Sequence, residues 1–202
     1  MVTLAYVHPG TVHACFLDSV VNLQGSFRPY MLGIMSAQSG PLLSKARNLI
    51  VEGFLSTNSN YLLFADTDMH FLPGAVEALY EADKPIVGAL YYGVNQEDGT
   101  TFPVALTKQD GVYKPLPGGD IPERGCKRVD AVGMGLTLIK REVLESLDVN
   151  PATLQPFSET IMEGRAVGED VTFCLRAKQK GFHTWLCGDA RVGHAKTFII
   201  DG

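Results

Sequence analysis

The first 91 residues alternate between short apolar runs and longer segments with apolar residues three or four positions apart. The runs at residues 4–7, 30–35, 61–65 and 85–91 have the length of buried strands. Thr11 and Pro41 stand where helices would begin, and a third helix is predicted over residues 73–81. Helical spacing is carried by two sets of residues: Val12, Phe16 and Val20, and then Leu42, Ala46, Leu49, Ile50 and Phe54. This alternation predicts a doubly wound α/β arrangement.

The second half of the chain has a different pattern. Residues 102–106 and 112–113 flank the turn Gln109-Asp110-Gly111, which predicts a hairpin, and residues 136–139 form another strand-like run. A helix is expected over residues 169–180, followed by a strand over 182–186. Residues 150–165 contain two prolines and little periodicity, which predicts a long mobile loop that closes over a ligand. The sheet is therefore expected to become mixed here.

Composition narrows the class of protein. A chain of 202 residues with 46% hydrophobic content fits one domain, residues 1–202, with a substantial core. A net charge of −5 argues against binding dominated by nucleic acid backbone. The four cysteines form no CxxC pair, so they match neither a zinc site nor a disulfide framework. There is no secretory leader and no uncharged apolar run of about 18 residues, so we expect a cytoplasmic protein without membrane insertion.

The clearest chemical signal follows the third apolar run. Asp66 and Asp68 come directly after residues 61–65, at what would be the carboxyl end of a central parallel strand. Two carboxylates at such a position can hold Mg²⁺ or Mn²⁺ against a diphosphate. A solvated turn or a helix cap would use the same residues, and the strand context favours the metal site.

Other candidates are weaker when taken singly. Glu169 and Asp170 open the helix predicted over residues 169–180, where either helix capping or acid–base chemistry would place carboxylates. His194 offers a neutral imidazole as a third metal ligand. Arg47, on the helix before the Asp-x-Asp strand, could direct a fixed positive charge at phosphate oxygens or form a surface ion pair.

A basic group and a glycine-rich stretch follow one another in the second half. Arg124, Lys127 and Arg128 are the local candidates for contacting an anionic acceptor. Residues 133–135, Gly-Met-Gly, would permit either the close approach of a ligand to the backbone or a tight bend.

Taken in chain order, these features resemble the GT-A glycosyltransferases, especially compact family-2-like members from viral and microbial genomes. The resemblance covers nearly the whole chain. It implies an α/β, Rossmann-like GT-A fold, a three-layer sandwich with a mostly parallel central sheet and a mixed, smaller C-terminal part. Residues 1–91 would be the nucleotide-binding half and residues 92–202 the acceptor-binding half. The segments that carry it are residues 7–11, Ala46-Arg47-Asn48, residues 62–68, residues 132–135, Gly168-Glu169-Asp170 and Gly193-His194.

The resemblance also implies a role for each matching residue. Asp170 would be the catalytic base of an inverting enzyme, and Glu169 would assist it or bind the acceptor. The stretch that would also contact the acceptor is Gly133, Met134 and Gly135. The nucleotide would be bound by Pro9, Gly10, Thr11, Arg47, Asp66 and Asp68. The metal ligands would be Asp66, Asp68 and His194.

The implied reaction moves a sugar from a nucleotide-sugar donor to an acceptor hydroxyl with the help of Mn²⁺ or Mg²⁺. A UDP-sugar is the commonest donor of the family, and the acceptor would be a glycan, a protein or a modified nucleic acid base. The outcome at the anomeric carbon stays open between inversion and retention. For a viral protein the location would be the host cytoplasm, and the oligomeric state is open.

Two other functions fit parts of the pattern. Haloacid-dehalogenase-like phosphatases also place Asp-x-Asp after an apolar strand, with the first carboxylate as nucleophile, although their motif normally opens the domain. A non-catalytic module that binds a nucleotide-sugar or a glycan would share the fold without the chemistry. Sugar-nucleotide pyrophosphorylases are disfavoured, because residues 8–12 do not form their glycine-rich, arginine-containing loop.

Overall fold

The computed structural model describes residues 1–26, 30–162 and 164–196. The helical elements are α1 (Ala14–Ser26), α2 (Leu43–Leu55), α3 (Pro73–Glu81), α4 (Arg141–Glu145), α5 (Glu169–Gln179) and the 3₁₀ turns η2 (Gly118–Asp120) and η3 (Pro151–Thr153). The strands are β1 (Val2–His8), β2 (Met31–Gln38), β3 (Tyr61–Ala65), β4 (Met69–His70), β5 (Ile86–Leu90), β6 (Tyr92–Val94), β7 (Thr101–Pro103), β8 (Ala105–Gln109), β9 (Val112–Pro115), β10 (Cys126–Val129), β11 (Ala131–Val132), β12 (Leu136–Lys140), β13 (Thr160–Met162), β14 (Arg165–Val167), β15 (Thr184–Arg191) and β16 (Gly193–His194).

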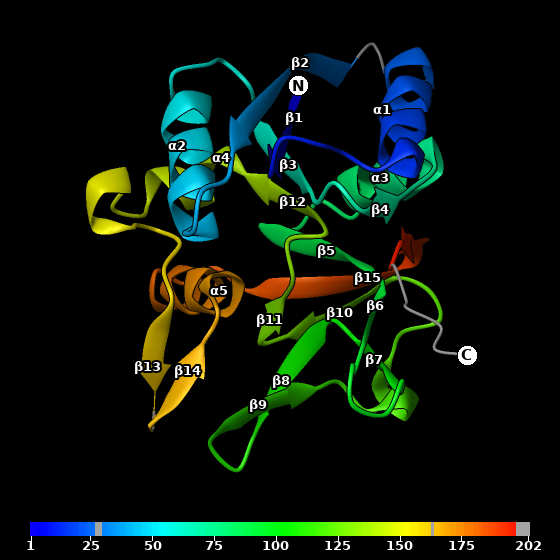
Figure 1. Ribbon diagram of the computed structural model, residues 1–202, viewed down its shortest axis with the longest axis vertical. Coiled ribbons are helices and arrows are strands. Elements are labelled where there is room, and N and C mark those ends of the chain that lie inside the picture. Colours follow the sequence, from blue (N-terminus) through cyan, green and yellow to red (C-terminus); the bar gives the residue numbers. More distant parts are fainter. Residues whose placement is uncertain (27–29, 163, 197–202) are drawn as a thin grey trace.

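A seven-stranded sheet runs through the molecule in the order β10-β15-β5-β12-β3-β1-β2 (Figure 1). The pairs β2–β1, β1–β3 and β5–β15 are parallel, whereas β12 is antiparallel to both of its neighbours and β10 is antiparallel to β15. Five of the seven strands therefore point the same way, and β1, β3 and β5 end at one edge of the sheet. This is the edge at which open α/β sheets bind ligands.

Helices cover both faces of this sheet. Alternation along β3 sends Leu63 and Ala65 into one apolar cluster, with α1 and α3, and sends Leu62 and Phe64 into a second cluster, with α2, α4 and α5. The helices stand on opposite sides of the sheet in Figure 1. The result is a three-layer sandwich with a core on each side.

A smaller part of the chain lies beyond the lower edge of the sheet in Figure 1. It contains a three-stranded antiparallel sheet, β11-β8-β9, and the β13–β14 hairpin. The same half of the chain also contributes β10, β12 and β15 to the main sheet. The second half of the sequence therefore builds the small part and also supplies strands to the large sheet.

Several elements follow the sequence prediction closely. The strand at Tyr61–Ala65 and the helix at Pro73–Glu81 have the predicted bounds, and α5 ends one residue before the predicted position. The predicted hairpin forms around Asp110 and Gly111, with β8 and β9 as its strands. All four cysteines are free thiols. Within the part of the chain that the structure describes, no helix has the length and apolar character needed to cross a membrane.

Three local predictions were wrong. Helix α1 begins at Ala14, so Thr11 is not its N-cap, and Val12 lies outside the helix and is 39% exposed. Leu42 lies just before α2 and is exposed rather than buried. Leu49 is on α2 but is also exposed, because the inward face of this helix carries Arg47 and Asn48. Residues 150–165 are not one long loop, since η3, β13 and the start of β14 fall within them.

Candidate functional site

Two loops meet at the edge where β1 and β3 end. The parallel register Ala5↔Phe64 brings the residues after β1 beside the Asp-x-Asp segment after β3. The backbone N–H of His13 donates to the carbonyl of Thr67 at 3.0 Å, which joins the two loops directly. The predicted nucleotide-binding residues Pro9, Gly10 and Thr11 are exposed on this rim.

Arg47 connects this edge to helix α5. Its Nη2 donates to Asp66 Oδ1 at 3.0 Å, and its Nη1 donates to Glu169 Oε1. The Arg47 side chain is 4% exposed, that of Glu169 is 14% exposed, and that of Asp66 is 40% exposed. Burial works against the charge of Arg47, but Asp66, Glu169 and Asp170 together keep its pKa above the ordinary value. Arg47 is thus a permanent cation shared by three carboxylates.

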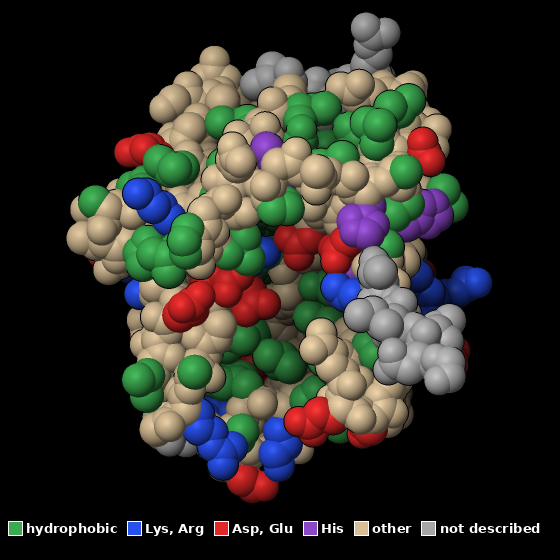
Figure 2. All heavy atoms as spheres, in the orientation of Figure 1, with side chains coloured by type: hydrophobic (Ala, Val, Ile, Leu, Met, Phe, Trp, Pro, Cys, Tyr) green, Lys and Arg blue, Asp and Glu red, His purple; other side chains and the backbone are tan. Residues whose placement is uncertain are grey.

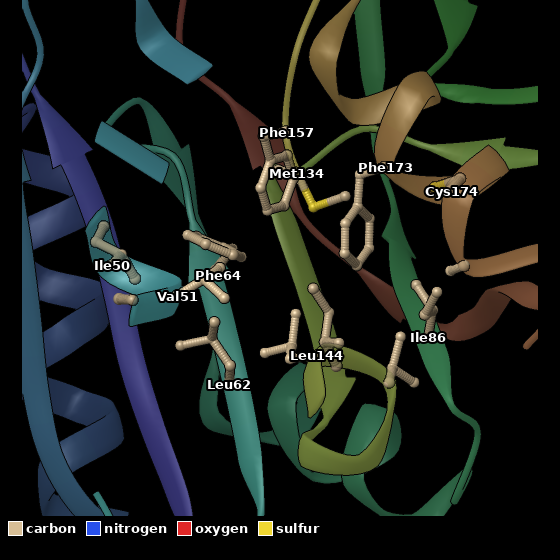
Figure 3. Close-up of a cluster of buried hydrophobic side chains, with 14 of the residues drawn as sticks. Ile50, Val51, Leu62, Phe64, Ile86, Met134, Leu144, Phe157, Phe173 and Cys174 are labelled. Carbon is tan, nitrogen blue, oxygen red and sulfur yellow. The ribbon is translucent and has the colours of Figure 1, made fainter. Parts of the chain in front are cut away.

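The neighbouring residue Asn48 fixes the position of Arg47. Asn48 Nδ2 donates to the carbonyl of Phe157 at 2.7 Å, and its Oδ1 accepts from the Phe157 N–H at 2.8 Å. The Phe157 ring stacks on Phe173 of α5 with centroids 4.5 Å apart and meets Phe64 of β3 edge-on (Figure 3). The Arg47 guanidinium carbon lies 6.0 Å from the Phe157 centroid. Helix α2, strand β3 and helix α5 are therefore held together by packed rings directly beneath the charged groups.

Asp68 has a separate set of partners. Its Oδ2 accepts from Lys196 Nζ at 2.8 Å and lies 3.1 Å from His194 Nε2. Partial burial opposes ionisation of Asp68, yet the hydrogen bond from Lys196 and the charge of His194 outweigh it and lower the pKa of this carboxyl. The carbonyl of Tyr92 lies 2.9 Å from His194 Nδ1 and can only accept, so Nδ1 carries a hydrogen.

The orientation of the His194 ring determines whether it can bind a divalent metal. A charged His194 ring donates a hydrogen bond from Nε2 to Asp68 Oδ2, 3.1 Å away, whereas a neutral ring with its hydrogen on Nδ1 presents a lone pair from Nε2 on the same side. A backbone carbonyl on Nδ1 with Nε2 left for the metal is the usual arrangement of a histidine ligand. The donor set fits Mn²⁺ or Mg²⁺, which take one or two carboxylates together with substrate phosphates. The ammonium of Lys196 lies on the same oxygen.

The predicted metal ligands do not all converge. Among the described residues, no three His, Cys, Asp or Glu side chains are grouped closely enough to hold a metal by themselves. Asp68 and His194 meet, while Asp66 is turned toward Arg47. A metal held here would therefore depend on oxygen ligands from the bound substrate as well.

Asp170 lies on the first turn of α5, beside this charge network. Burial and the charge of Glu169 raise its pKa, and Arg47 opposes that shift only in part. Its Oδ1 accepts from the backbone N–H of Val171 at 2.7 Å. Asp170 and Asp66 also both raise the pKa of Tyr91, whose largest shift comes from burial. The carboxylates from β3 and α5 thus share one electrostatic environment.

The predicted acceptor-binding stretch, residues 133–135, is buried next to Tyr91. A Cβ on Gly133 would lie 2.2 Å from the Tyr91 hydroxyl oxygen, and one on Gly135 would lie 2.6 Å from the Tyr91 ring. The N–H of Gly135 donates to that hydroxyl at 3.2 Å, and Met134 is 1% exposed. Gly133 and Gly135 therefore leave room for the Tyr91 side chain, which packs directly against residues 133–135.

Figure 2 shows these groups on one face of the molecule. Acidic side chains and histidines gather around the upper part of a central hollow, at the level where β1 and β3 end in Figure 1. The sequence did not indicate that Tyr91 and Lys196 lie at this site. For Tyr91, the sequence signal is the pair Gly133 and Gly135 on either side of Met134, since two glycines so close together leave space for a large side chain. For Lys196 no pattern distinguishes it from any surface lysine.

The fold has counterparts among solved structures, whereas the sequence matches no protein-family profile and no curated protein. The crystal structure of GalNAc-T7 with UDP, GalNAc and Mn²⁺ aligns with a TM-score of 0.66 and 14% identity over 96% of this chain. That alignment covers 43% of the GalNAc-T7 chain, so this protein spans less than half of its length. The crystal structure of A197 from STIV aligns with a TM-score of 0.58 and 17% identity, covering 100% of this chain and 97% of A197.

These similarities establish the fold. A mainly parallel seven-stranded sheet between two helical layers, aligned with a GT-A glycosyltransferase, confirms the predicted α/β, GT-A-like, Rossmann-like class. At 14% and 17% identity they carry no residue roles from one protein to the other.

Proposed function

We propose that this protein is a glycosyltransferase that moves a sugar from a nucleotide-sugar donor to an acceptor hydroxyl. The observation that carries the proposal is the Arg47 bridge, which joins Asp66 after β3 to Glu169 beside Asp170 on α5. A donor-binding edge and a candidate general base are thereby held in one rigid unit on a GT-A-like fold. A module that only binds sugars has no need of a partly buried carboxylate with a raised pKa at this position.

The donor would lie along the edge formed by residues 9–11 and Asp66. Residues 9–11 are exposed to a base and ribose, and Arg47 keeps Asp66 in a fixed orientation. Asp68 and His194 are the residues that would hold a divalent cation, and Lys196 would have to move from Asp68 as it binds. Such a cation stabilises the negative charge on the departing nucleoside diphosphate.

Asp170 would take the proton of the acceptor hydroxyl. A carboxylate with a raised pKa is a stronger base than an exposed aspartate. Arg47 and the Val171 N–H orient the ionised form and limit the rise in pKa. Direct attack by the activated hydroxyl on the sugar C1 inverts the anomeric configuration. Glu169 is engaged by Arg47, so its role in this scheme is to position α5.

Titration calorimetry tests the donor half of the proposal. UDP, GDP and CDP are each titrated into the protein with and without Mn²⁺, and we expect binding of one nucleotide that requires the metal, with UDP the first choice. Asp68→Asn should abolish the metal dependence. Asp18→Asn is the matched control, because Asp18 is an exposed carboxylate on α1, outside the site. Metal-independent binding that is equal in both variants would remove Asp68 from the site.

Donor hydrolysis or transfer tests the catalytic half. With the nucleotide identified, the corresponding nucleotide-sugars are incubated with the wild type and with Asp170→Asn. We expect loss of turnover of about 100-fold or more with nucleotide affinity retained, as for removal of a general base. Retained turnover would exclude Asp170 as the base. Absence of nucleotide binding, combined with release of phosphate from phosphomonoesters that Asp66→Asn abolishes, would replace the proposal with a phosphatase.

A further inference from the structure

Two of the four cysteines lie opposite each other at one edge of the main sheet. Strands β10 and β15 are antiparallel neighbours (Figure 1), and their register pairs Cys126 directly with Cys187. Residues opposite each other in an antiparallel pair have Cα atoms about 4.5 or 5.5 Å apart, depending on the hydrogen-bonding pattern. A disulfide spans Cα separations of about 4.4–6.8 Å. The backbone of this pair can therefore carry a disulfide without rearrangement.

Both cysteine side chains point to the same face of the sheet. Cys187 belongs to the first apolar cluster, Cys126 packs against that cluster, and the two thiols are hydrogen-bonded to each other. Backbone groups directly beside them fix the two strands. The Gly188 N–H donates to the Gly125 carbonyl at 2.8 Å, and the Gly125 N–H donates to Asp189 Oδ2 at 2.6 Å. The fold therefore holds the two sulfur atoms side by side.

The other two cysteines are placed differently. Cys15 is on helix α1, and Cys174 is on helix α5, so neither takes part in a strand pairing. Cys174 belongs to the second apolar cluster, on the other face of the sheet from Cys126 and Cys187. Its thiol donates to the Val132 carbonyl at 4.0 Å. The direct pairing of two thiols is thus a feature of β10 and β15.

Exposure and acidity determine how this pair reacts. Cys126 is partly exposed, whereas Cys187 is 1% exposed, so a reagent reaches Cys126 first. Burial is the largest cause that raises the pKa of the Cys126 thiol to about 12, and the neighbouring Cys187 adds to the rise. The charge of Lys84 opposes it. Because the thiolate is the attacking species, the first step is slow. A thiol of high pKa is also a poor leaving group, so the bond resists reduction once formed.

We propose that Cys126 and Cys187 are the site of a cross-strand disulfide, formed by exchange with a low-molecular-weight disulfide of the oxidised glutathione type. The Cys126 thiolate attacks one sulfur of the reagent, and one glutathione leaves and takes up the proton that Cys126 lost. Cys187 then loses its proton and attacks the Cys126 sulfur of the mixed disulfide. The second glutathione leaves with that proton. Two cysteine thiols are oxidised, and one small disulfide is reduced to two thiols.

The bond would secure an edge of the main sheet. Strand β10 is four residues long and stands at the end of the strand order, with β15 as its neighbour in that sheet. The disulfide would tie β10 to β15 and close a loop over residues 127–186, which restricts the unfolded chain. The same strand carries Lys127 and Arg128 of the basic group predicted from the sequence, and Lys127 pairs with Asp120 at 2.5 Å. This inference does not depend on the proposed function.

Peptide mapping of the full chain tests the pairing. The native protein is incubated with oxidised glutathione until the number of free thiols is constant. Remaining thiols are blocked with iodoacetamide, and proteolytic fragments are analysed by mass spectrometry without reduction. We expect fragments joined through Cys126 and Cys187, loss of two of the four thiols, and a rise in Tm of about 5–10 °C that dithiothreitol reverses. A lasting glutathione adduct on Cys126, four unreacted thiols, or a bond to Cys15 or Cys174 would overturn the proposal.

Single variants show whether both thiols are needed. Cys187→Ala should stop the reaction at the mixed disulfide, so that Cys126 keeps one glutathione and the Tm does not rise on oxidation. Cys15→Ala is the matched control, because Cys15 is a partly exposed cysteine outside the pair, and it should form the bond to the same extent as the wild type. A rise in Tm in Cys187→Ala equal to that of the wild type would overturn the site. If Cys187→Ala does not fold, the peptide maps of the wild type and of Cys15→Ala decide.

Discussion

Replacing Arg47 by methionine should unfold the protein more easily, because it strands a carboxylate in the interior. Removing one partner of a buried ion pair typically costs about 3–5 kcal/mol. Asp66 is 40% exposed and can be rehydrated, so most of the loss comes from Glu169, which is 14% exposed. We therefore expect the low end of that range, about 3 kcal/mol. For a domain of this size this corresponds to a fall in Tm of roughly 6–12 °C.

Urea unfolding and thermal melts at pH 5 and pH 8 measure this effect. The pKa of Asp170 is already raised, and it rises further when the Arg47 cation is removed. The variant therefore regains stability as the pH falls through the new pKa, and the loss of unfolding free energy should be smaller at pH 5 than at pH 8. Lys45→Met, on an exposed position of the same helix, is the control. Adding Glu169→Gln to Arg47→Met should restore part of the stability. A loss below about 1 kcal/mol, the scale of an exposed pair, or a loss equal at both pH values, would refute the reasoning.

Three further predictions follow from the same geometry. The pKa of Asp170 is raised in the folded state, so the stability of the wild type falls as the pH rises from the ordinary aspartate range through that pKa. Asp170→Asn should therefore have a higher Tm than the wild type at pH 8 and the same Tm at pH 4. Lys196→Met should increase Mn²⁺ affinity about two- to five-fold by freeing Asp68 Oδ2, measured by electron paramagnetic resonance, and unchanged affinity would contradict the competition. Gly188→Ala places a Cβ 2.2 Å from the Pro122 carbonyl oxygen and should destabilise the protein by about 3 kcal/mol in urea, whereas a neutral effect would mean that this segment moves aside.

The sequence is most informative where one physical effect dominates. Strand β3 is a run of five apolar residues buried on both faces, and α3 begins at a proline, so periodicity and helix-start rules predict both elements. The prediction for helix α2 fails because its inward face carries Arg47 and Asn48. Their partners Glu169 and Phe157 lie more than a hundred residues away in the sequence. A polar residue buried by such distant partners looks like a surface residue in the sequence.

The same limit applies to the site. Asp66, Asp68 and Asp170 are recognisable because each stands at the boundary of a predicted element, where sheet topology brings such residues to one edge. The partners of these carboxylates are set by tertiary packing. For this reason the sequence leaves Arg47 open between a phosphate contact and an ion pair, and the structure places it between two carboxylates. A pocket lined by the β8–β9 hairpin and by residues around β14 and the start of α5 was beyond prediction, because these segments lie far apart in the sequence.

Strand β12 lies antiparallel between β3 and β5, which makes the two halves of the chain inseparable. A fragment ending near residue 91 would contain β3 and β5 without the strand that joins them, leaving two open, apolar edges that invite aggregation. The last central pairing must also wait for residues made late in synthesis, so this fold matures by long-range contacts rather than by stepwise addition of units. For the same reason, the corresponding halves of other proteins cannot be exchanged at this boundary, and diversification has to proceed through the hairpins at the periphery.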